Sequence, residues 1–270
     1  MQTLSEIRQL LAERGLRPKH RFGQNFLHDK NQLAKLIGAA EIAPGDVVLE
    51  VGPGTGTLTE ALLEHGAEVI ACELDRDLAA LVRDRLGDRI TLIEGDCLEG
   101  ERRLNRKIVS ALAGRPFKLV ANLPYQAASP LMGALLMDHP ECAGVYVTIQ
   151  KEVADRLLAP PGTKAYGPLT VIIRSLADVR KLAILKPTSF WPQPKVTSAM
   201  VAITPKPGST PSHDFAKFIT ELFAKRRKQL GGIFAARGRT IQWPAGVSPE
   251  QRPESLDVDQ LVALWQAARQ

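Results

Sequence analysis

The sequence of 270 residues has few cysteines and no long apolar run, and each of these shortages excludes a class of protein. Its three cysteines, Cys72, Cys97 and Cys142, are odd in number and lack a CxxC spacing, which argues against a disulfide framework or a zinc site. No apolar stretch approaches the roughly 18 residues of a membrane span, and the N-terminal residues lack the apolar core of a signal peptide. We therefore expect a cytoplasmic protein that uses neither a membrane nor a metal ion.

Basic residues are concentrated in the second part of the chain. Residues 1–150 contain 17 basic and 20 acidic side chains, and residues 151–270 contain 18 and 9. The main basic run consists of Lys225, Arg226, Arg227 and Lys228. Arg237 and Arg239 follow it and extend the basic region. Such a distribution is typical of a protein that binds a polyanion, although a solvated helix end on a basic surface is an alternative.

Short apolar runs alternate with helical patterns between about residues 47 and 149. Strands are predicted at VVLEV, VIACEL, ITLIEGD, FKLVAN and AGVYVTIQ, and a helical pattern follows each of the first four. This alternation is typical of βαβ units, so we predict a doubly wound α/β domain with a mostly parallel sheet covered on both faces. Two helices are predicted before it, at about residues 4–14 and from a cap at Asp29 to about Ala40.

The region after residue 150 predicts a change of organisation. A helix near Lys151 is followed by extended runs at about residues 179–185 and 196–203, and the three prolines of KPTSFWPQPK between them are expected to prevent regular strand pairing. The segment TPKPGSTPS, residues 204–212, has the composition of a linker. Helical patterns follow it, so we predict one domain over residues 1–205 and a small helical domain over residues 206–270.

A glycine-rich loop follows the first predicted strand of the α/β region. In VVLEVGPGTGTLTEAL, Gly52, Gly54 and Gly56 lie between the strand and the next helix, where glycine lets the backbone approach a ligand closely. The dinucleotide fingerprint G-x-G-x-x-G requires a glycine where this chain has Thr57, which weakens an assignment to NAD.

Three acidic residues at strand ends indicate the ligand. Glu73 ends the second strand and can bind both hydroxyls of a ribose, a group that NAD and S-adenosylmethionine share. Glu50 would repel a pyrophosphate but attract an ammonium or sulfonium group, and Asp96 can accept a hydrogen bond from an adenine amine. The pattern favours S-adenosylmethionine, with a nucleotide site or a structural turn as alternatives.

The tetrapeptide Asn122-Leu123-Pro124-Tyr125 follows the fourth strand, where ligands bind in open α/β sheets. The lone pair of an aromatic amine is delocalised, so an enzyme must bind the amine N–H groups with acceptors that turn the lone pair toward the methyl group. The Asn122 side-chain oxygen and the Leu123 or Pro124 carbonyl are candidates, and Tyr125 offers a face on which a flipped base can stack. The alternative is a turn in which Asn122 only caps the next helix.

Taken together, these motifs resemble bacterial 16S ribosomal RNA adenine N6,N6-dimethyltransferases. The resemblance runs from about Pro18 to Leu230 and is carried by FGQNFL, EVGPGTGTLT, ELD, GDCL, NLPY, QKEVADRL, KAYGPLT, FWPQPKV and FAKRRKQL. It implies a seven-stranded Rossmann-like methyltransferase sheet. It also implies transfer of two methyl groups from S-adenosylmethionine to N6 of each of two adjacent adenines in the 3′-terminal hairpin of 16S rRNA, within the immature small subunit.

The resemblance also implies roles for individual residues. Tyr125 and Phe190 would sandwich the target base, while Asn122 and Pro124 hold its amine. The cofactor residues would be Gln24, Asn25, Leu27, Glu50, Gly52, Gly54, Gly56, Glu73, Asp96 and the Asn122 backbone. RNA contacts are expected from Arg21, Lys195 and the basic run Lys225–Lys228.

One segment departs from the family pattern. After NLPY the chain has Gln126-Ala127-Ala128-Ser129-Pro130, where the family commonly has Asn-Ile-Ser-Ser-Pro or Asn-Ile-Ser-Thr-Pro. Two alternatives remain open: a 23S rRNA adenine dimethyltransferase of the macrolide-resistance type, and a ribosome-assembly or transcription factor that binds without needing methylation.

Overall fold

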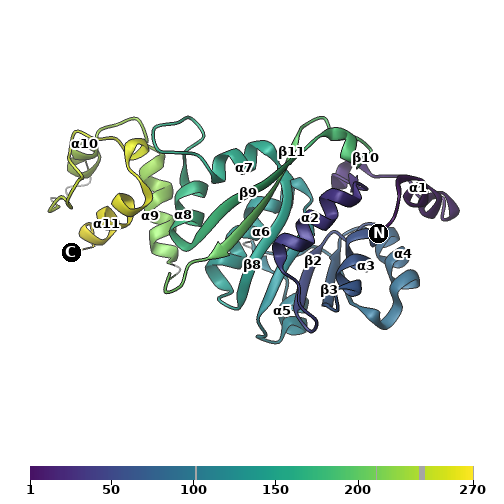
Figure 1. Ribbon diagram of the computed structural model, residues 1–270. Coiled ribbons are helices and arrows are strands. Elements are labelled where there is room, and N and C mark those ends of the chain that lie inside the picture. The colour runs from purple at the N-terminus through teal and green to yellow at the C-terminus, as the bar shows by residue number, and fades with distance from the viewer. Residues whose placement is uncertain (101, 211, 237–240, 270) are drawn as a thin grey trace. The chain divides into compact units, whose positions relative to one another are not determined.

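A seven-stranded sheet organises the larger part of the chain (Figure 1). The computed structural model describes residues 1–100, 102–210, 212–236 and 241–269. Within these ranges, the strands lie across the sheet in the order β4 (Thr91–Glu94), β3 (Glu68–Glu73), β2 (Val47–Val51), β7 (Phe117–Asn122), β8 (Cys142–Gln150), β11 (Ser198–Pro205) and β9 (Ala177–Leu185).

The sheet is mostly parallel, as predicted. Strand β2 pairs in parallel with β3 and with β7, β3 pairs with β4, and β7 pairs with β8, whereas β11 is antiparallel to β8. From β2 the chain proceeds outward to β3 and β4 and then crosses to β7 on the other side. The strand order therefore reverses between β2 and β7, and a ligand crevice is expected at the carboxyl ends of these two strands.

Helices cover both faces of the sheet (Figure 1). Val48, Val69 and Val120 pack in one apolar cluster with α2 (Lys30–Ala40) and α3 (Thr57–Glu64). Leu49 and Ile70, one residue further along their strands, are also fully buried, because successive side chains point to opposite faces. Further helices of this region are α1 (Leu4–Glu13), α4 (Arg76–Leu86), α5 (Arg106–Leu112) and α6 (Tyr125–Asp138), and the next helix, α7 (Lys151–Leu157), begins in this region and ends outside it.

Two short antiparallel pairs accompany the main sheet. β1 (Phe26–Leu27) pairs with β10 (Phe190–Trp191), and β5 (Leu98–Glu99) pairs with β6 (Arg103–Leu104). The expectation that the prolines of KPTSFWPQPK prevent pairing was wrong. Strand β10 occupies the two residues between Ser189 and Pro192, and neither strand residue is a proline, so their backbone groups are available for pairing.

The chain divides into two compact units, residues 1–154 with 180–204 and residues 155–179 with 205–270. The smaller unit contains α8 (Pro168–Leu176), α9 (His213–Phe223), α10 (Leu230–Ala235) and α11 (Val258–Ala267). It includes residues 155–179, which lie outside the range 206–270 predicted for the C-terminal domain. Fully buried Tyr166 from that segment donates a hydrogen bond of 2.8 Å to the Leu256 carbonyl and so ties the two segments together.

Among the residues that the structure describes, no helix combines the length and the apolar composition of a membrane span.

Candidate cofactor and substrate site

A cavity of about 650 Å³ opens at the predicted crevice of the larger unit. Its walls come from the loops after β2, β3, β4 and β7, from the N-terminal segment around residues 18–27, and from the segment around β10. This volume is typical of a pocket for a small-molecule ligand.

The glycine-rich loop needs its glycines for two reasons. Gly52, Gly54 and Gly56 have φ angles of 76°, 62° and 83°, in the left-handed region that favours glycine. A Cβ atom on Gly52 would also lie 3.3 Å from the Pro124 ring, and one on Gly54 would lie 3.0 Å from the Phe26 ring. The loop therefore packs directly against the NLPY turn on one side and against β1 on the other.

Two buried carboxyl groups face the cavity from β2 and β3. Glu50 is 1% exposed, and burial raises its pKa to about 8, although the Thr59 hydroxyl donates a hydrogen bond of 2.6 Å to it. Burial likewise raises the pKa of Glu73 to about 7, while the backbone N–H groups of Asp75 and Gly54 donate to its two oxygens. Two acids in one cavity are stabilised in their charged forms by a cationic ligand.

Asp96 lies at the exposed edge of the same cavity. One carboxylate oxygen accepts a hydrogen bond of 3.0 Å from the Leu98 N–H. The carboxylate retains acceptor capacity for a second donor, as the predicted contact with an adenine amine requires.

The NLPY turn has a fixed orientation. The Asn122 side-chain nitrogen donates to the Asn25 carbonyl at 2.9 Å. Because a carbonyl can only accept, this bond places the Asn122 amide oxygen on the opposite side, where it is available as an acceptor. The Tyr125 hydroxyl forms a hydrogen bond of 2.9 Å with the fully buried Ser198 hydroxyl of β11. Both side chains for which the sequence predicts a role are thus held by residues far away in sequence.

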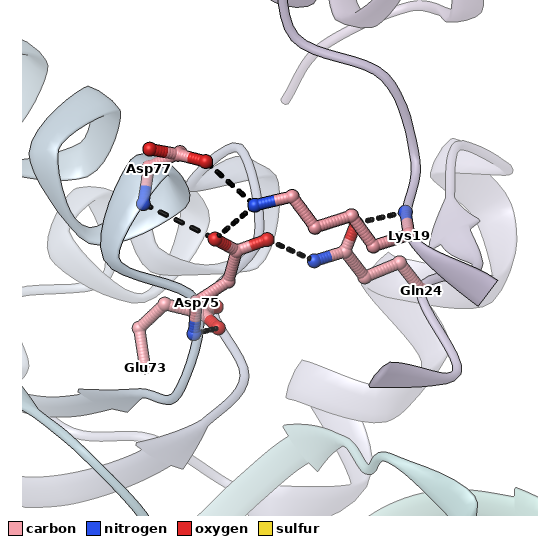
Figure 2. Close-up of polar contacts among 5 residues, drawn as sticks. All are labelled: Lys19, Gln24, Glu73, Asp75 and Asp77. Carbon is pink, nitrogen blue, oxygen red and sulfur yellow. Dashed lines mark hydrogen bonds and ion pairs between the residues drawn. The ribbon is translucent and has the colours of Figure 1, made fainter. Parts of the chain in front are cut away.

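The N-terminal segment contributes Gln24, Asn25 and Leu27 to the cavity wall. Both polar atoms of the Gln24 side chain are engaged within the protein: its oxygen accepts from the Lys19 N–H, and its nitrogen donates to Asp75 at 2.7 Å (Figure 2). Leu27 is buried and pairs with Phe190 across β1 and β10.

Phe190 and the predicted RNA contacts are differently exposed. Phe190 lines the cavity but is only 2% exposed, whereas Arg21 and Lys195 line the same cavity and are exposed. The basic run lies in the smaller unit, where Lys225, Arg227 and Lys228 are exposed. Arg237 and Arg239 lie outside the described residues.

Arg226 differs from its neighbours in the basic run. Its guanidinium donates to Glu254 at 2.7 Å and to the carbonyls of Thr163 and Lys164 at 3.0 and 3.3 Å. These bonds connect three segments of the smaller unit, so Arg226 has a structural partner for each part of its donor fork.

The sequence did not mark Ser198, Lys19 or Asp75, which the structure places in hydrogen bonds with the predicted site residues Tyr125 and Gln24. No local motif marks Ser198, since its role arises only when β11 lies beside β8 near the NLPY turn. Asp75 had a weak signal, because it follows Glu73 by two residues in the ELD motif.

The strand order, the glycine-rich loop beside buried acids and the NLPY turn define the class of α/β methyltransferases. The family model for ribosomal RNA adenine dimethylase matches residues 15–268. The chain belongs to this family, as its motifs predicted.

Individual relatives support the same assignment. The ribosomal RNA small subunit methyltransferase A of Phenylobacterium zucineum is 39% identical over 100% of this chain and 96% of the relative. The protein of that name from Mycobacterium tuberculosis is 37% identical over 96% of this chain and 86% of the relative.

Two solved structures are also similar. A dimethyladenosine transferase from Plasmodium falciparum is 27% identical with a TM-score of 0.72, covering 88% of this chain and 95% of that one. The 23S rRNA methyltransferase ErmE, 24% identical over 91% of this chain and 100% of its own, shares the fold with a TM-score of 0.66. The chain is therefore an rRNA adenine dimethyltransferase, an enzyme class that in general takes its methyl groups from S-adenosylmethionine.

Proposed function

We propose that this enzyme methylates N6 of two adjacent adenines in the 3′-terminal hairpin of 16S rRNA, in the cytoplasm, on an immature small ribosomal subunit. The relatives named as small-subunit methyltransferases support this choice of rRNA. The main structural support for methylation of an amine is the orientation of the Asn122 amide. Its nitrogen donates to the Asn25 carbonyl, so its oxygen faces away and is available as an acceptor.

The cavity residues fit S-adenosylmethionine. Glu73, held by two backbone N–H groups, would bind the ribose hydroxyls, and Asp96 at the edge would bind the adenine amine. Glu50 would face the cationic methionine end, beside a wall formed by Asn25 and Leu27. When bound, the cofactor supplies a methyl group on a sulfonium, which is a good leaving group.

The NLPY turn would prepare the target amine. The Pro124 carbonyl already accepts a hydrogen bond from the Ala127 N–H at 3.0 Å, in the first turn of α6. We assign the second acceptor to the Leu123 carbonyl, because the Pro124 carbonyl has only one lone pair left after its bond to Ala127, and Pro124 fixes the backbone that presents the Leu123 carbonyl. With both N–H groups held, the nitrogen lone pair turns out of the ring plane, and positioning supplies most of the rate. Tyr125 and Phe190 would enclose the base.

The smaller unit, including the C-terminal domain predicted over residues 206–270, would bind rRNA through Lys225, Arg227 and Lys228. These residues are exposed, whereas Arg226 is engaged with Glu254. Arg21 and Lys195 would contact RNA at the edge of the cavity in the larger unit.

The test is methyl transfer from labelled cofactor to undermethylated small subunits. We expect label on N6 of two neighbouring adenines near the 3′ end of 16S rRNA, and label confined to 23S rRNA would contradict the proposal. Asn122→Ala should abolish transfer but leave subunit binding unchanged. Full methylation by this variant would contradict the assignment of the Asn122 side-chain oxygen as an acceptor for the target amine.

A further inference from the structure

The carboxylate of Asp75 binds both ends of a short loop in the N-terminal segment (Figure 2). One oxygen accepts from the Lys19 ammonium at 2.8 Å, and the other accepts from the Gln24 side chain at 2.7 Å. The Gln24 oxygen in turn accepts from the Lys19 N–H at 2.7 Å, which closes the loop on itself. The four residues between Lys19 and Gln24 include the short helix His20–Phe22, which carries Arg21 into the cavity wall.

Burial makes the Asp75 contacts more than a surface ion pair. The Asp75 side chain is 4% exposed, whereas that of Asp77, which also binds Lys19 at 2.6 Å, is 55% exposed. Burial alone would raise the pKa of Asp75, but the hydrogen bonds from Lys19 and Gln24 lower it below its ordinary value. An exposed pair contributes little, and a buried carboxylate without its partner is costly. The loop is therefore held mainly through Asp75.

Hydrogen bonds connect the same loop to two residues of the proposed site, Glu73 and Asn122. The Asp75 N–H donates to Glu73 at 2.9 Å, and its side chain caps α4 by accepting from the Asp77 N–H. On the other side, the residue after Gln24 is Asn25, whose carbonyl accepts from the Asn122 amide. Movement of the loop would therefore release the cavity wall and the orientation of Asn122 together.

We propose that Lys19, Gln24 and Asp75 form a positioning cluster that fixes the loop 19–25 against the end of β3 and thereby aligns the cofactor wall with the Asn122 amide. This inference rests on the proposed function, since it assigns how that site is held. Gln24 contributes to this cluster through hydrogen bonds to Lys19 and Asp75. These bonds engage both the oxygen and the nitrogen of the Gln24 side chain.

The test compares Lys19→Met with Lys19→Arg. We expect Lys19→Met to raise the Kd for S-adenosylhomocysteine about tenfold, the equivalent of losing its hydrogen bond to the buried Asp75 carboxylate, and to lower kcat at saturating cofactor several-fold. Lys19→Arg retains the charge and two or more donors, so it should restore both values to within about twofold. Calorimetry gives Kd without RNA, and single-turnover methylation gives the rate.

Asp77→Asn is the matched control, because it removes only the negative charge of the exposed partner of Lys19. If it weakens cofactor binding as much as Lys19→Met does, or if Lys19→Met changes neither Kd nor kcat, the cluster is not a positioning device. Thermal unfolding of each variant shows how much is folded, so a merely structural loss is separated from altered binding. Wild-type protein that binds no S-adenosylhomocysteine would contradict the proposed function instead.

Discussion

At the scale of single residues, we expect Glu50 to favour cofactor binding at the expense of stability. Its pKa is about 8 in the folded protein and near 4.5 in an unfolded chain. A raised pKa contributes stability that is fully present below pH 4.5 and is lost as the pH rises through about 8. We expect Glu50→Gln to raise the Tm of the cofactor-free protein at pH 8 by about 3 °C or more, and not at pH 4. Calorimetric unfolding at both pH values is the measurement.

The same variant should weaken binding of the cationic cofactor. Because ionised Glu50 and Glu73 favour a cation, wild-type affinity should rise with pH through the pKa values of about 7 and 8. In Glu50→Gln the rise above pH 7 should disappear. Titration of S-adenosylmethionine at pH 6, 7 and 8 checks this, and a wild-type affinity that falls with pH would contradict the assignment.

Tyr125 should contribute through its ring and not through proton transfer. Tyr125→Ala should lower kcat/KM about 5- to 150-fold, the equivalent of about 1 to 3 kcal/mol of base stacking. Tyr125→Phe keeps the ring but loses the bond to Ser198, so it should retain most of the activity, and Ser198→Ala should match it. Steady-state kinetics on small subunits distinguish these cases. Equal losses of kcat/KM in Tyr125→Ala and Tyr125→Phe would mean that the Tyr125 hydroxyl, and not the ring, makes the contribution.

At the scale of elements, the contact between the glycine-rich loop and the NLPY turn can be tested with two glycines. Gly52 and Gly45 both have positive φ angles, 76° and 88°, so alanine should cost about 1 to 2 kcal/mol of backbone strain at either position. Only at Gly52 would the new Cβ meet Pro124, at 3.3 Å, while nothing lies within 4 Å at Gly45. Gly52→Ala should therefore lower kcat at least tenfold more than Gly45→Ala, at similar Tm. Equal activities would show that the turn does not depend on this approach.

The sequence predicted the elements whose signals are local. The β2, β3 and β7 strands, the glycine-rich loop and the Asp29 cap of α2 each depend on neighbouring residues, and Asp29 accepts from the N–H groups of Asn31 and Gln32 as expected. Pairing of β1 with β10 could not be predicted, because it joins residues more than 160 positions apart through two-residue strands.

The candidate site shows the same division. The positions of Glu50, Glu73 and the NLPY turn at or near the ends of predicted strands were enough to predict that they lie at one edge of the sheet. The bond from Asn122 to Asn25 and the bond from Arg226 to Glu254 depend on tertiary placement. Sequence composition treats every arginine of a basic run alike, so it could not separate Arg226 from Arg227.

At the scale of the whole molecule, the charge asymmetry of the chain predicts that the two units have different functions. The larger unit contains the cavity, and the smaller unit contains the basic run. The double variant Arg227→Ala with Lys228→Ala should reduce the salt slope of RNA binding by about 2, because each side chain would neutralise one phosphate. Its Kd for S-adenosylhomocysteine should stay unchanged, because neither residue lines the cavity.

Arg226→Ala should behave in the opposite way. It removes the bonds that Arg226 donates to Glu254 and to the Lys164 carbonyl, while the Thr163 carbonyl keeps its bond from the Tyr166 N–H, so it should lower Tm by several degrees and change the salt slope by less than about 1. Lys35→Ala, at an exposed position of α2, controls for the loss of a positive charge elsewhere. Filter binding at four salt concentrations, with thermal unfolding of each variant, separates the two roles. If Arg226→Ala reduced the slope as much as the double variant without loss of Tm, phosphate would compete successfully with Glu254, and the whole run would act as one RNA contact.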